Sequence, residues 1–282
     1  MTADFQWSKF GVNWGSRSYV MGIINVTPDS FSGDGLAKTP DEAMWPELAA
    51  AQAQRFIAEG VDCLDIGAVS TRPKAPEVSY DTERRRLIPA VKAVAAAVSK
   101  KIPISIDTTD SRIAQEAIEC GASIINDISG LQGDPAMAKV AAQAHCGVVI
   151  MANLRKERHA SVMNDVTRFL AKSLDIAYQA GIAQEQISID PGFGFGPLPS
   201  ENITMIRMLE TLKVFGAPII FGASRKSTLS KLLAGAPPAD LLEASLAAAV
   251  AAILHGADMV RVHDVAATVK ARVIADAIRF GL

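Results

Sequence analysis

The feature that most constrains the fold is a pattern that repeats eight times along the 282-residue chain. Each unit is a short apolar run that ends on polar residues and is followed by a segment of helix length. The apolar runs lie at 19–24, 61–66, 102–106, 123–125, 147–151, 187–190, 218–221 and 258–262. The helical segments carry apolar residues at i, i+3 and i+4, and lie at 41–59, 81–98, 111–120, 135–145, 162–181, 202–213, 239–255 and 264–280. Strict alternation of this kind predicts parallel strands joined by right-handed crossovers.

Eight such units over residues 19–282 are typical of an α/β fold, the (β/α)8 or TIM barrel, which takes about 250 residues. An open, doubly wound sheet shows the same alternation and is the alternative architecture. The count of eight and the lack of a G-x-G-x-x-G motif after the first run favour the barrel. No linker interrupts the pattern, so we expect a single domain over 19–282. Residues 1–18, with Trp7 and Trp14, would form a short N-terminal extension, as a hairpin or a lid.

The composition excludes several classes of function. A formal net charge of -2 and a pI near 6.1 argue against a broad nucleic-acid or membrane surface, and any anionic ligand would need a local cluster of cations. The longest nearly uncharged run, 244–254, is much shorter than the roughly 20 residues of a membrane helix. Three cysteines without CxxC spacing predict reduced core thiols, and no signal peptide is visible. We therefore expect a cytoplasmic protein.

Polar residues follow the apolar runs at the same relative position in unit after unit. The stretch 187–196 ends its run at Asp190 and then alternates glycines with Phe193 and Phe195. In parallel α/β folds the ligand site lies at the carboxyl ends of the strands. Taken singly, each polar residue could be a helix cap or a surface ion-pair partner, but their shared position predicts one site. They are Asn25, Thr71, Arg72, Asp107, Asn126, Asp190, Lys226, Arg261 and His263.

These side chains fall into two chemical groups. The first offers hydrogen-bond donors and acceptors that suit the edge of a flat heterocycle: Asp107, Asn126, Asp190 and Lys226. The second is cationic or neutral-polar and suits phosphates: Asn25, Arg72, Arg261 and His263. The oxygen of Asn25 is also a suitable ligand for Mg²⁺. Because no Ser-His-Asp triad, zinc spacing or P-loop occurs, we expect displacement assisted by charge stabilisation rather than covalent catalysis.

Seven motifs in this chain resemble those of the dihydropteroate synthase family, and they occur in the family's order. They are 21–31 (MGIINVTPDSF), 70–73 (STRP), 105–108 (SIDT), 125–130 (INDISG), 190–196 (DPGFGFG), 224–227 (SRKS) and 261–264 (RVHD). The resemblance covers 20–282 and implies a TIM-barrel transferase of folate synthesis. Its members join 6-hydroxymethyl-7,8-dihydropterin pyrophosphate to 4-aminobenzoate and release pyrophosphate from the pterin methylene before the amine attacks.

The resemblance also implies roles for individual residues. The pterin would be bound by Asp107, Asn126, Met151, Asp190 and Lys226. Pyrophosphate would be bound by Asn25, Thr71, Arg72, Arg261 and His263, and Asn25 would ligate Mg²⁺. The aminobenzoate pocket would be formed by Thr71, Pro73, Phe195 and Ser227. The catalytic residues would be Asp107, Lys226 and Arg261, and the loops 26–37 and 68–78 would close over the site.

Three departures from the family pattern leave alternatives open. Residues 67–70 (GAVS) lack the usual second glycine and glutamate, 152–155 (ANLR) replace a His-Met segment, and Pro197 stands where lysine is common. A pterin-binding paralogue without synthase activity, and a corrinoid-linked methyltransferase, are therefore kept as alternatives. The retained 224–227 and 261–264 motifs favour the synthase. The family also implies a homodimer, although helices such as 246–254 would pack within one chain by default.

Overall fold

The eight predicted strands form one parallel sheet that curls into a barrel. The computed structural model describes residues 6–27, 42–70, 75, 77–155 and 161–281. The strands are β1 (Tyr19–Asn25), β2 (Cys63–Gly67), β3 (Ile104–Asp107), β4 (Ile124–Asp127), β5 (Gly147–Met151), β6 (Ile187–Asp190), β7 (Ile220–Phe221) and β8 (Met259–Val262). Their order is β6-β5-β4-β3-β2-β1-β8-β7, and a parallel bridge between Ile189 and Ile219 joins β6 to β7. The barrel prediction is confirmed.

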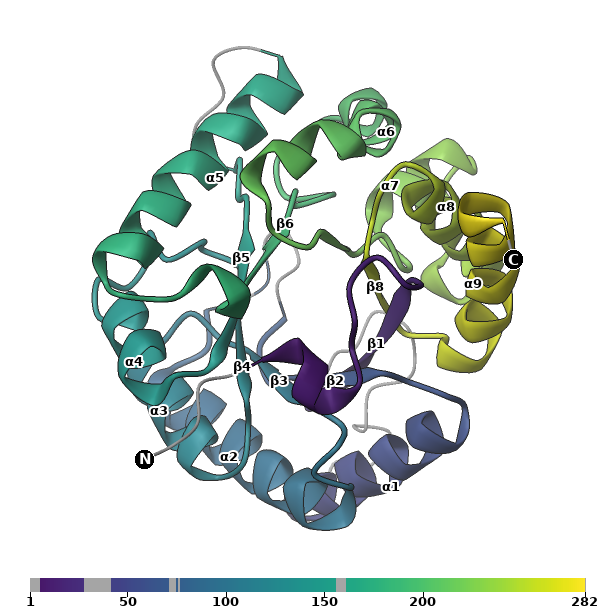
Figure 1. Ribbon diagram of the computed structural model, residues 1–282. Coiled ribbons are helices and arrows are strands. Elements are labelled where there is room, and N and C mark those ends of the chain that lie inside the picture. Colours follow the sequence, from purple (N-terminus) through teal and green to yellow (C-terminus); the bar gives the residue numbers. More distant parts are fainter. Residues whose placement is uncertain (1–5, 28–41, 71–74, 76, 156–160, 282) are drawn as a thin grey trace.

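A ring of helices surrounds the strands (Figure 1). The α-helices are α1 (Trp45–Ala58), α2 (Tyr80–Ala97), α3 (Ser111–Glu119), α4 (Met137–Ala144), α5 (Val162–Gln179), α6 (Pro199–Arg207), α7 (Ser227–Leu232), α8 (Leu242–Leu254) and α9 (Val265–Phe280). The predicted segment 202–213 is divided into α6 and a 3-10 helix, η5 (Leu209–Phe215). Helix α7 was not predicted, because six residues are too few to show a helical period.

Side chains alternate between the two faces of the barrel wall. Outward residues such as Ile24, Ile66 and Ile106 are fully or almost fully buried against the helices. Inward residues fill the barrel near the amino-terminal ends of the strands. There a second apolar cluster is formed by Tyr19, Met21, Cys63, Ile124, Val149, Ile220 and Met259. The apolar filling therefore occupies the amino-terminal half of the barrel, and the carboxyl ends are left to polar side chains.

The N-terminal segment covers the amino-terminal end of the barrel rather than the carboxyl end. Trp7 and Val12 are buried against the inward cluster, and Trp14 meets the rings of Trp7 and Tyr19 edge to face, at centroid distances of 5.0 and 5.4 Å. Figure 1 shows this purple segment lying across the strands. Residues 6–18 hold the 3-10 helix η1 (Trp7–Phe10) and turns without a strand, so the predicted hairpin is wrong for this part.

Two composition-based expectations concern the described residues. The thiols of Cys63 and Cys146 are buried, that of Cys120 is partly buried, and all three are free. The helices in the described part of the chain are each too short or too polar to cross a membrane.

Candidate active site

The predicted polar residues meet because the strand register aligns the strand ends. Asn25 pairs with Gly67, Gly67 pairs with Asp107, and Asp107 pairs with Asn126 across β1 to β4. A Cβ on Gly67 would lie 3.4 Å from the Cβ of Asp107, which is an ordinary van der Waals contact, so the two strand ends lie side by side. Asp190 is likewise the last residue of β6. The site thus lies at the carboxyl end of the barrel, as the sequence predicts.

A buried ion network lies directly below this end. The Nε of Arg261 donates to Asp65 at 2.6 Å, and its Nη2 donates to Asp107 at 3.0 Å. Asp65 is fully buried and also accepts from Ser105 Oγ at 2.6 Å and from Asn126 Nδ2 at 3.3 Å. Asp65 therefore fixes both the arginine that the sequence assigned to the pyrophosphate and the amide that it assigned to the pterin.

Sequence reasoning missed Asp65, because it lies in the middle of an apolar strand rather than at its end. A signal was present, since an aspartate in a strand that is buried on both sides needs charged or hydrogen-bonding partners. Asp65 also has the same parity as Gly67 along β2, and this parity places both on the inward face.

The groups around Asp107 shift the pKa of its carboxyl in opposite directions. Burial raises the pKa of its carboxyl to about 7, although Arg261 acts to lower it, while Asp65 and other nearby carboxylates raise it further. Asp107 therefore changes its charge near neutral pH. A carboxylate poised in this way can carry negative charge to a developing cation in the site.

Asp190 and Lys226 form the other side of the site. Burial raises the pKa of Asp190, and Lys226 and the backbone N–H of Gly192, which donates to it at 2.7 Å, act in the opposite direction. Burial lowers the pKa of Lys226 to about 8, with partial compensation from Asp190. The Nζ of Lys226 donates to the carbonyl of Phe193 at 2.6 Å. The ammonium is thus attached to the loop after β6, within electrostatic reach of the Asp190 carboxylate, and keeps further donors for a ligand.

The glycine-rich loop after β6 is packed against the loop after β5. A Cβ on Gly192 would lie 1.7 Å from the carbonyl oxygen of Ala152, and the φ of Gly192 is +77°. The backbone N–H of Leu154 donates to the carbonyl of Phe195 at 2.9 Å. The segment 152–155 is therefore packed against the glycine-rich loop that follows Asp190.

Two cations lie near the ring of Phe195. The guanidinium of Arg155 lies 4.4 Å and the Nζ of Lys226 4.7 Å from the ring centroid. Such contacts favour a cation over an aromatic face. Arg155 belongs to the segment 152–155, which the sequence analysis singled out.

His263 is neutral at pH 7. Burial, followed by the positive charges of Arg261, Arg225 and Lys226, lowers its pKa to about 3. Its Nδ1 shares a hydrogen bond with the Oγ of Ser224 at 3.0 Å. The histidine can therefore offer a neutral N–H to an anion, while the positive charge comes from Arg261.

The remaining predicted residues are placed less completely. Asn25 is half-buried at the end of β1, Met151 is buried at the end of β5, and Ser227 is exposed as the first residue of α7. Thr71, Arg72 and Pro73 lie outside the described residues, as do residues 28–37 of the first predicted closing loop and residues 71–74 and 76 of the second. Among the described residues, no group of three His, Cys, Asp or Glu is arranged to hold a metal.

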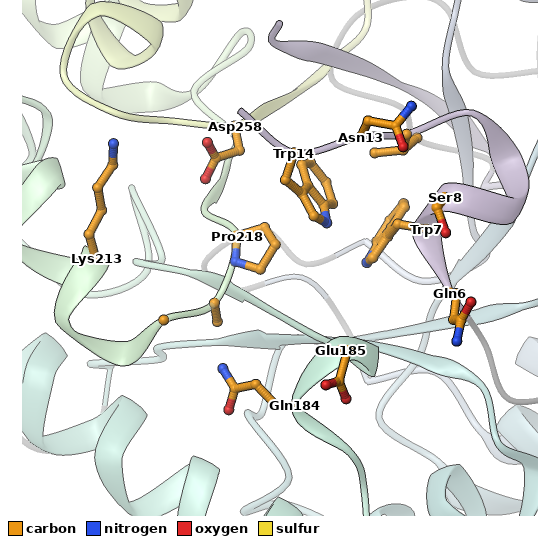
Figure 2. A pocket seen from close by; sticks show the side chains of 13 residues that line it. Gln6, Trp7, Ser8, Asn13, Trp14, Gln184, Glu185, Lys213, Pro218 and Asp258 are labelled. Carbon is orange, nitrogen blue, oxygen red and sulfur yellow. The ribbon is translucent and has the colours of Figure 1, made fainter. Parts of the chain in front are cut away.

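A separate pocket of about 680 Å³ lies at the other end of the barrel (Figure 2). Trp7, Trp14 and Pro218 line it, with Lys213 and Asp258 at its edges. Pro218 and Asp258 precede β7 and β8, so this pocket faces the amino-terminal ends of the strands. It is therefore distinct from the cluster at the carboxyl ends.

Comparison with known proteins agrees with this geometry. The family of pterin binding enzymes matches residues 21–263. Dihydropteroate synthase of Synechocystis sp. is 38% identical over 274 residues, which are 94% of this chain and 92% of the relative. The Clostridium difficile dihydropteroate synthase, solved in the presence of pteroic acid, superposes with a TM-score of 0.86 and 38% identity over 94% of this chain and 98% of that one.

A second solved structure contains the product of the reaction. The enzyme of Xanthomonas albilineans, in complex with 7,8-dihydropteroate, gives a TM-score of 0.81 and 33% identity over 94% of each chain. The matches extend over nearly the whole sequence and include the strand ends that form the site. The chain therefore belongs to the pterin-binding enzymes and, within them, to the dihydropteroate synthase family.

Proposed function

We propose that the residues at the carboxyl end of this barrel carry out the transferase reaction of the family, a step of folate biosynthesis. In this reaction, 6-hydroxymethyl-7,8-dihydropterin pyrophosphate and 4-aminobenzoate give 7,8-dihydropteroate and pyrophosphate. The observation that supports it best is the network in which Asp65 and Asp107 both bind Arg261. It places a titratable carboxylate next to a permanent cation. The carboxylate can stabilise positive charge that develops at a methylene carbon, and the arginine can stabilise negative charge on the leaving group.

The pterin is bound between the two sides of the site. The carboxylate of Asp190 accepts two parallel N–H groups from the pterin edge, and Lys226 and Asn126 donate to its acceptors. These side chains are buried or half-buried, so their hydrogen bonds to a ligand are strengthened by the low local dielectric. Met151, buried at the end of β5, supplies an apolar face.

The displacement proceeds in two stages. The bond between the methylene carbon and the pyrophosphate oxygen breaks first, and its electron pair leaves with the oxygen. The carboxylate of Asp107 stabilises the resulting pterin-methylene cation, while Arg261 stabilises the charge on the leaving group. The lone pair of the 4-aminobenzoate nitrogen then attacks the carbon, and the nitrogen loses its extra proton to solvent. Phe195 and Ser227 position the aminobenzoate, and Thr71, Arg72 and Pro73 complete the pockets.

The donor set fits a magnesium ion held mainly by substrate. Asn25 offers a neutral amide oxygen at the end of β1, and the described residues form no carboxylate cage around it. Mg²⁺ commonly takes one or two protein oxygens, with phosphate oxygens and water as its other ligands. When bound, the ion would neutralise charge on the pyrophosphate. Asn25 would hold it in place, and Arg261 and His263 would bind the remaining oxygens.

A homodimer and a cytoplasmic location complete the proposal. Val273, Ile274 and Ile278 of α9 are 50%, 62% and 65% exposed, and Leu254 of α8 is 41% exposed. Ile274 and Ile278 are four residues apart, so they lie on one face of the helix. An apolar face of this kind suits an isologous contact between two copies. Sedimentation of an Ile274→Glu variant tests this, since the variant is expected to be monomeric. The three free thiols are consistent with a reducing compartment.

The test of the reaction is pyrophosphate release from the pterin pyrophosphate, with and without 4-aminobenzoate. We expect aminobenzoate-dependent release, formation of dihydropteroate, and loss of turnover when Mg²⁺ is chelated. Asp190→Asn is expected to lower kcat/KM about 100-fold, since truncating a buried charged hydrogen-bond partner costs about 3 kcal/mol. Asp175→Asn, on the exposed side of α5, is the matched control and retains activity.

Two results would contradict the proposal. If the pterin pyrophosphate binds but no dihydropteroate forms, the chain is a binding paralogue. If Asp190→Asn retains full activity, the assignment of the pterin edge to Asp190 is wrong, whatever the reaction.

A further inference from the structure

The loop between β7 and α7 contains a residue in an unfavourable backbone conformation. Arg225 has a φ of +54° although it is not a glycine. The left-handed region costs an L-residue about 1–2 kcal/mol, and it persists where surrounding contacts impose it. Arg225 stands between Ser224 and Lys226, and the mechanism proposed above gives it no role.

Contacts from Arg225 to two other elements impose this conformation. Its Nε and Nη2 donate to the two carboxylate oxygens of Asp264 at 2.9 and 2.5 Å. The two side chains are only 12% and 20% exposed, so the ion pair is poorly screened by solvent. The backbone N–H of Arg225 donates to the Oγ of Ser245 at 2.9 Å, and this hydroxyl in turn donates to the carbonyl of Leu241. The loop is thus attached to α8 and to the start of α9.

The residues on either side of Arg225 contact the two halves of the site. The Oγ of Ser224 accepts the backbone N–H of His263 at 3.2 Å and shares a hydrogen bond with its Nδ1. Lys226 interacts electrostatically with Asp190 and donates to the loop after β6. Three consecutive residues therefore contact the β8–α9 loop, the start of α9 and the β6–α6 loop.

We infer that Arg225 is a positioning residue whose ion pair with Asp264 holds the β7–α7 and β8–α9 loops in register. This contact sets the separation between Lys226, on the pterin side, and His263, on the pyrophosphate side. The inference rests on the function proposed above for these two side chains. Arg225 itself does not touch a reacting atom, and it acts through its two neighbours.

The test compares variants of this pair with variants of a similar pair at the other end of the barrel. Arg225→Gln and Asp264→Asn each remove the ion pair; the second change is isosteric, and the first keeps an unbranched stem with a polar end. Arg17 donates to both oxygens of Asp62 at 3.1 and 2.6 Å, far from the site, so Arg17→Gln is the control. The measurements are Tm, kcat and KM for both substrates, and calorimetry with inorganic pyrophosphate and Mg²⁺.

All three single variants are expected to lose thermal stability. Arg225→Gln and Asp264→Asn are also expected to lower kcat/KM for the pterin pyrophosphate by roughly 10- to 100-fold, the effect of a displacement near 1 Å. Arg17→Gln retains its kinetic constants. The double variant, with both Arg225→Gln and Asp264→Asn, is expected to have a kcat/KM no lower than that of the less active single variant, since both changes remove the same contact. Arg225→Lys keeps the positive charge but cannot make the bidentate contact, so it is expected to lose less kcat/KM than Arg225→Gln.

Folded Arg225→Gln and Asp264→Asn proteins with the kinetic constants of the Arg17→Gln control would overturn the inference. If Arg225→Gln does not fold, Asp264→Asn decides, since it leaves the strained residue unchanged. Lys226→Met and His263→Gln are measured in parallel. If these two also keep full kcat/KM, the roles proposed for Lys226 and His263 are wrong. If they lose it while the Arg225 and Asp264 variants do not, only the positioning role is wrong.

Discussion

Replacing Asp65 by asparagine tests the central network most directly. Asp65 is fully buried and accepts hydrogen bonds from Arg261, Ser105 and Asn126. Removing one partner of a buried ion pair costs about 3–5 kcal/mol. Because Arg261 keeps Asp107 at 3.0 Å, we expect the lower end, about 3 kcal/mol. With an unfolding entropy of about 2 cal/mol/K per residue, this loss lowers Tm by roughly 5 °C.

The assay is urea unfolding of Asp65→Asn, with kcat/KM measured on the folded fraction. The control is Glu116→Gln, because Arg84 and Glu116 form a bidentate pair at 2.5 and 2.7 Å on the surface. The surface pair is expected to contribute much less, since it is screened by water. Equal losses in the two variants would refute the argument from burial. Unchanged kcat/KM in Asp65→Asn would show that the network does not position Arg261 for the reaction.

Three further predictions concern charge and backbone at the site. We expect kcat/KM to have a narrow bell-shaped pH profile. It should rise near pH 7 as Asp107 ionises and fall near pH 8 as Lys226 loses its proton. A flat profile from pH 6 to 9 would contradict this prediction. Arg155→Ala removes a charge that lowers the pKa of Lys226, so the basic limb of that profile is expected to move to higher pH, and an unmoved limb would exclude this coupling. Gly192→Ala and Gly181→Ala both place an alanine at positive φ, but only at Gly192 would the Cβ meet a carbonyl oxygen, at 1.7 Å. Urea unfolding should show a loss of about 1–2 kcal/mol for Gly181→Ala and a clearly larger loss for Gly192→Ala, and similar losses would show that the neighbouring loop yields easily.

The strands and the ends of the strands could be predicted from the sequence because two periodicities agree along the chain. Each apolar run is buried on both faces, and each helical segment carries one apolar stripe, so the alternation defines the barrel. Strand register then aligns Asn25, Asp107 and Asn126 without further information.

Other features depend on tertiary contacts that leave little local signal. Asp65 lies inside a strand, where only its parity with Gly67 indicates an inward side chain. Helix α7 has six residues, so it shows no helical period. The segment around Trp7 has no repeating pattern, and its position at the amino-terminal end is set by packing against the inward cluster. The contact of Arg225 with Asp264 joins residues 39 positions apart in the chain.

The barrel is less extensively hydrogen-bonded at the junction between β6 and β7 than between other strands such as β1 and β2. Here the strands are joined through the Ile189–Ile219 bridge and the bond from the N–H of Ile189 to the carbonyl of Pro218, whereas neighbouring strands such as β1 and β2 share a five-residue register. Asp190 and Lys226 stand on opposite sides of this junction. A ligand bound by both residues links the two strands. Ligand binding is therefore expected to stabilise the closed barrel, and the closed barrel to favour ligand binding. Local opening of the free enzyme is expected to begin along this line, and amide hydrogens on both of its sides to exchange more slowly once the ligand is bound.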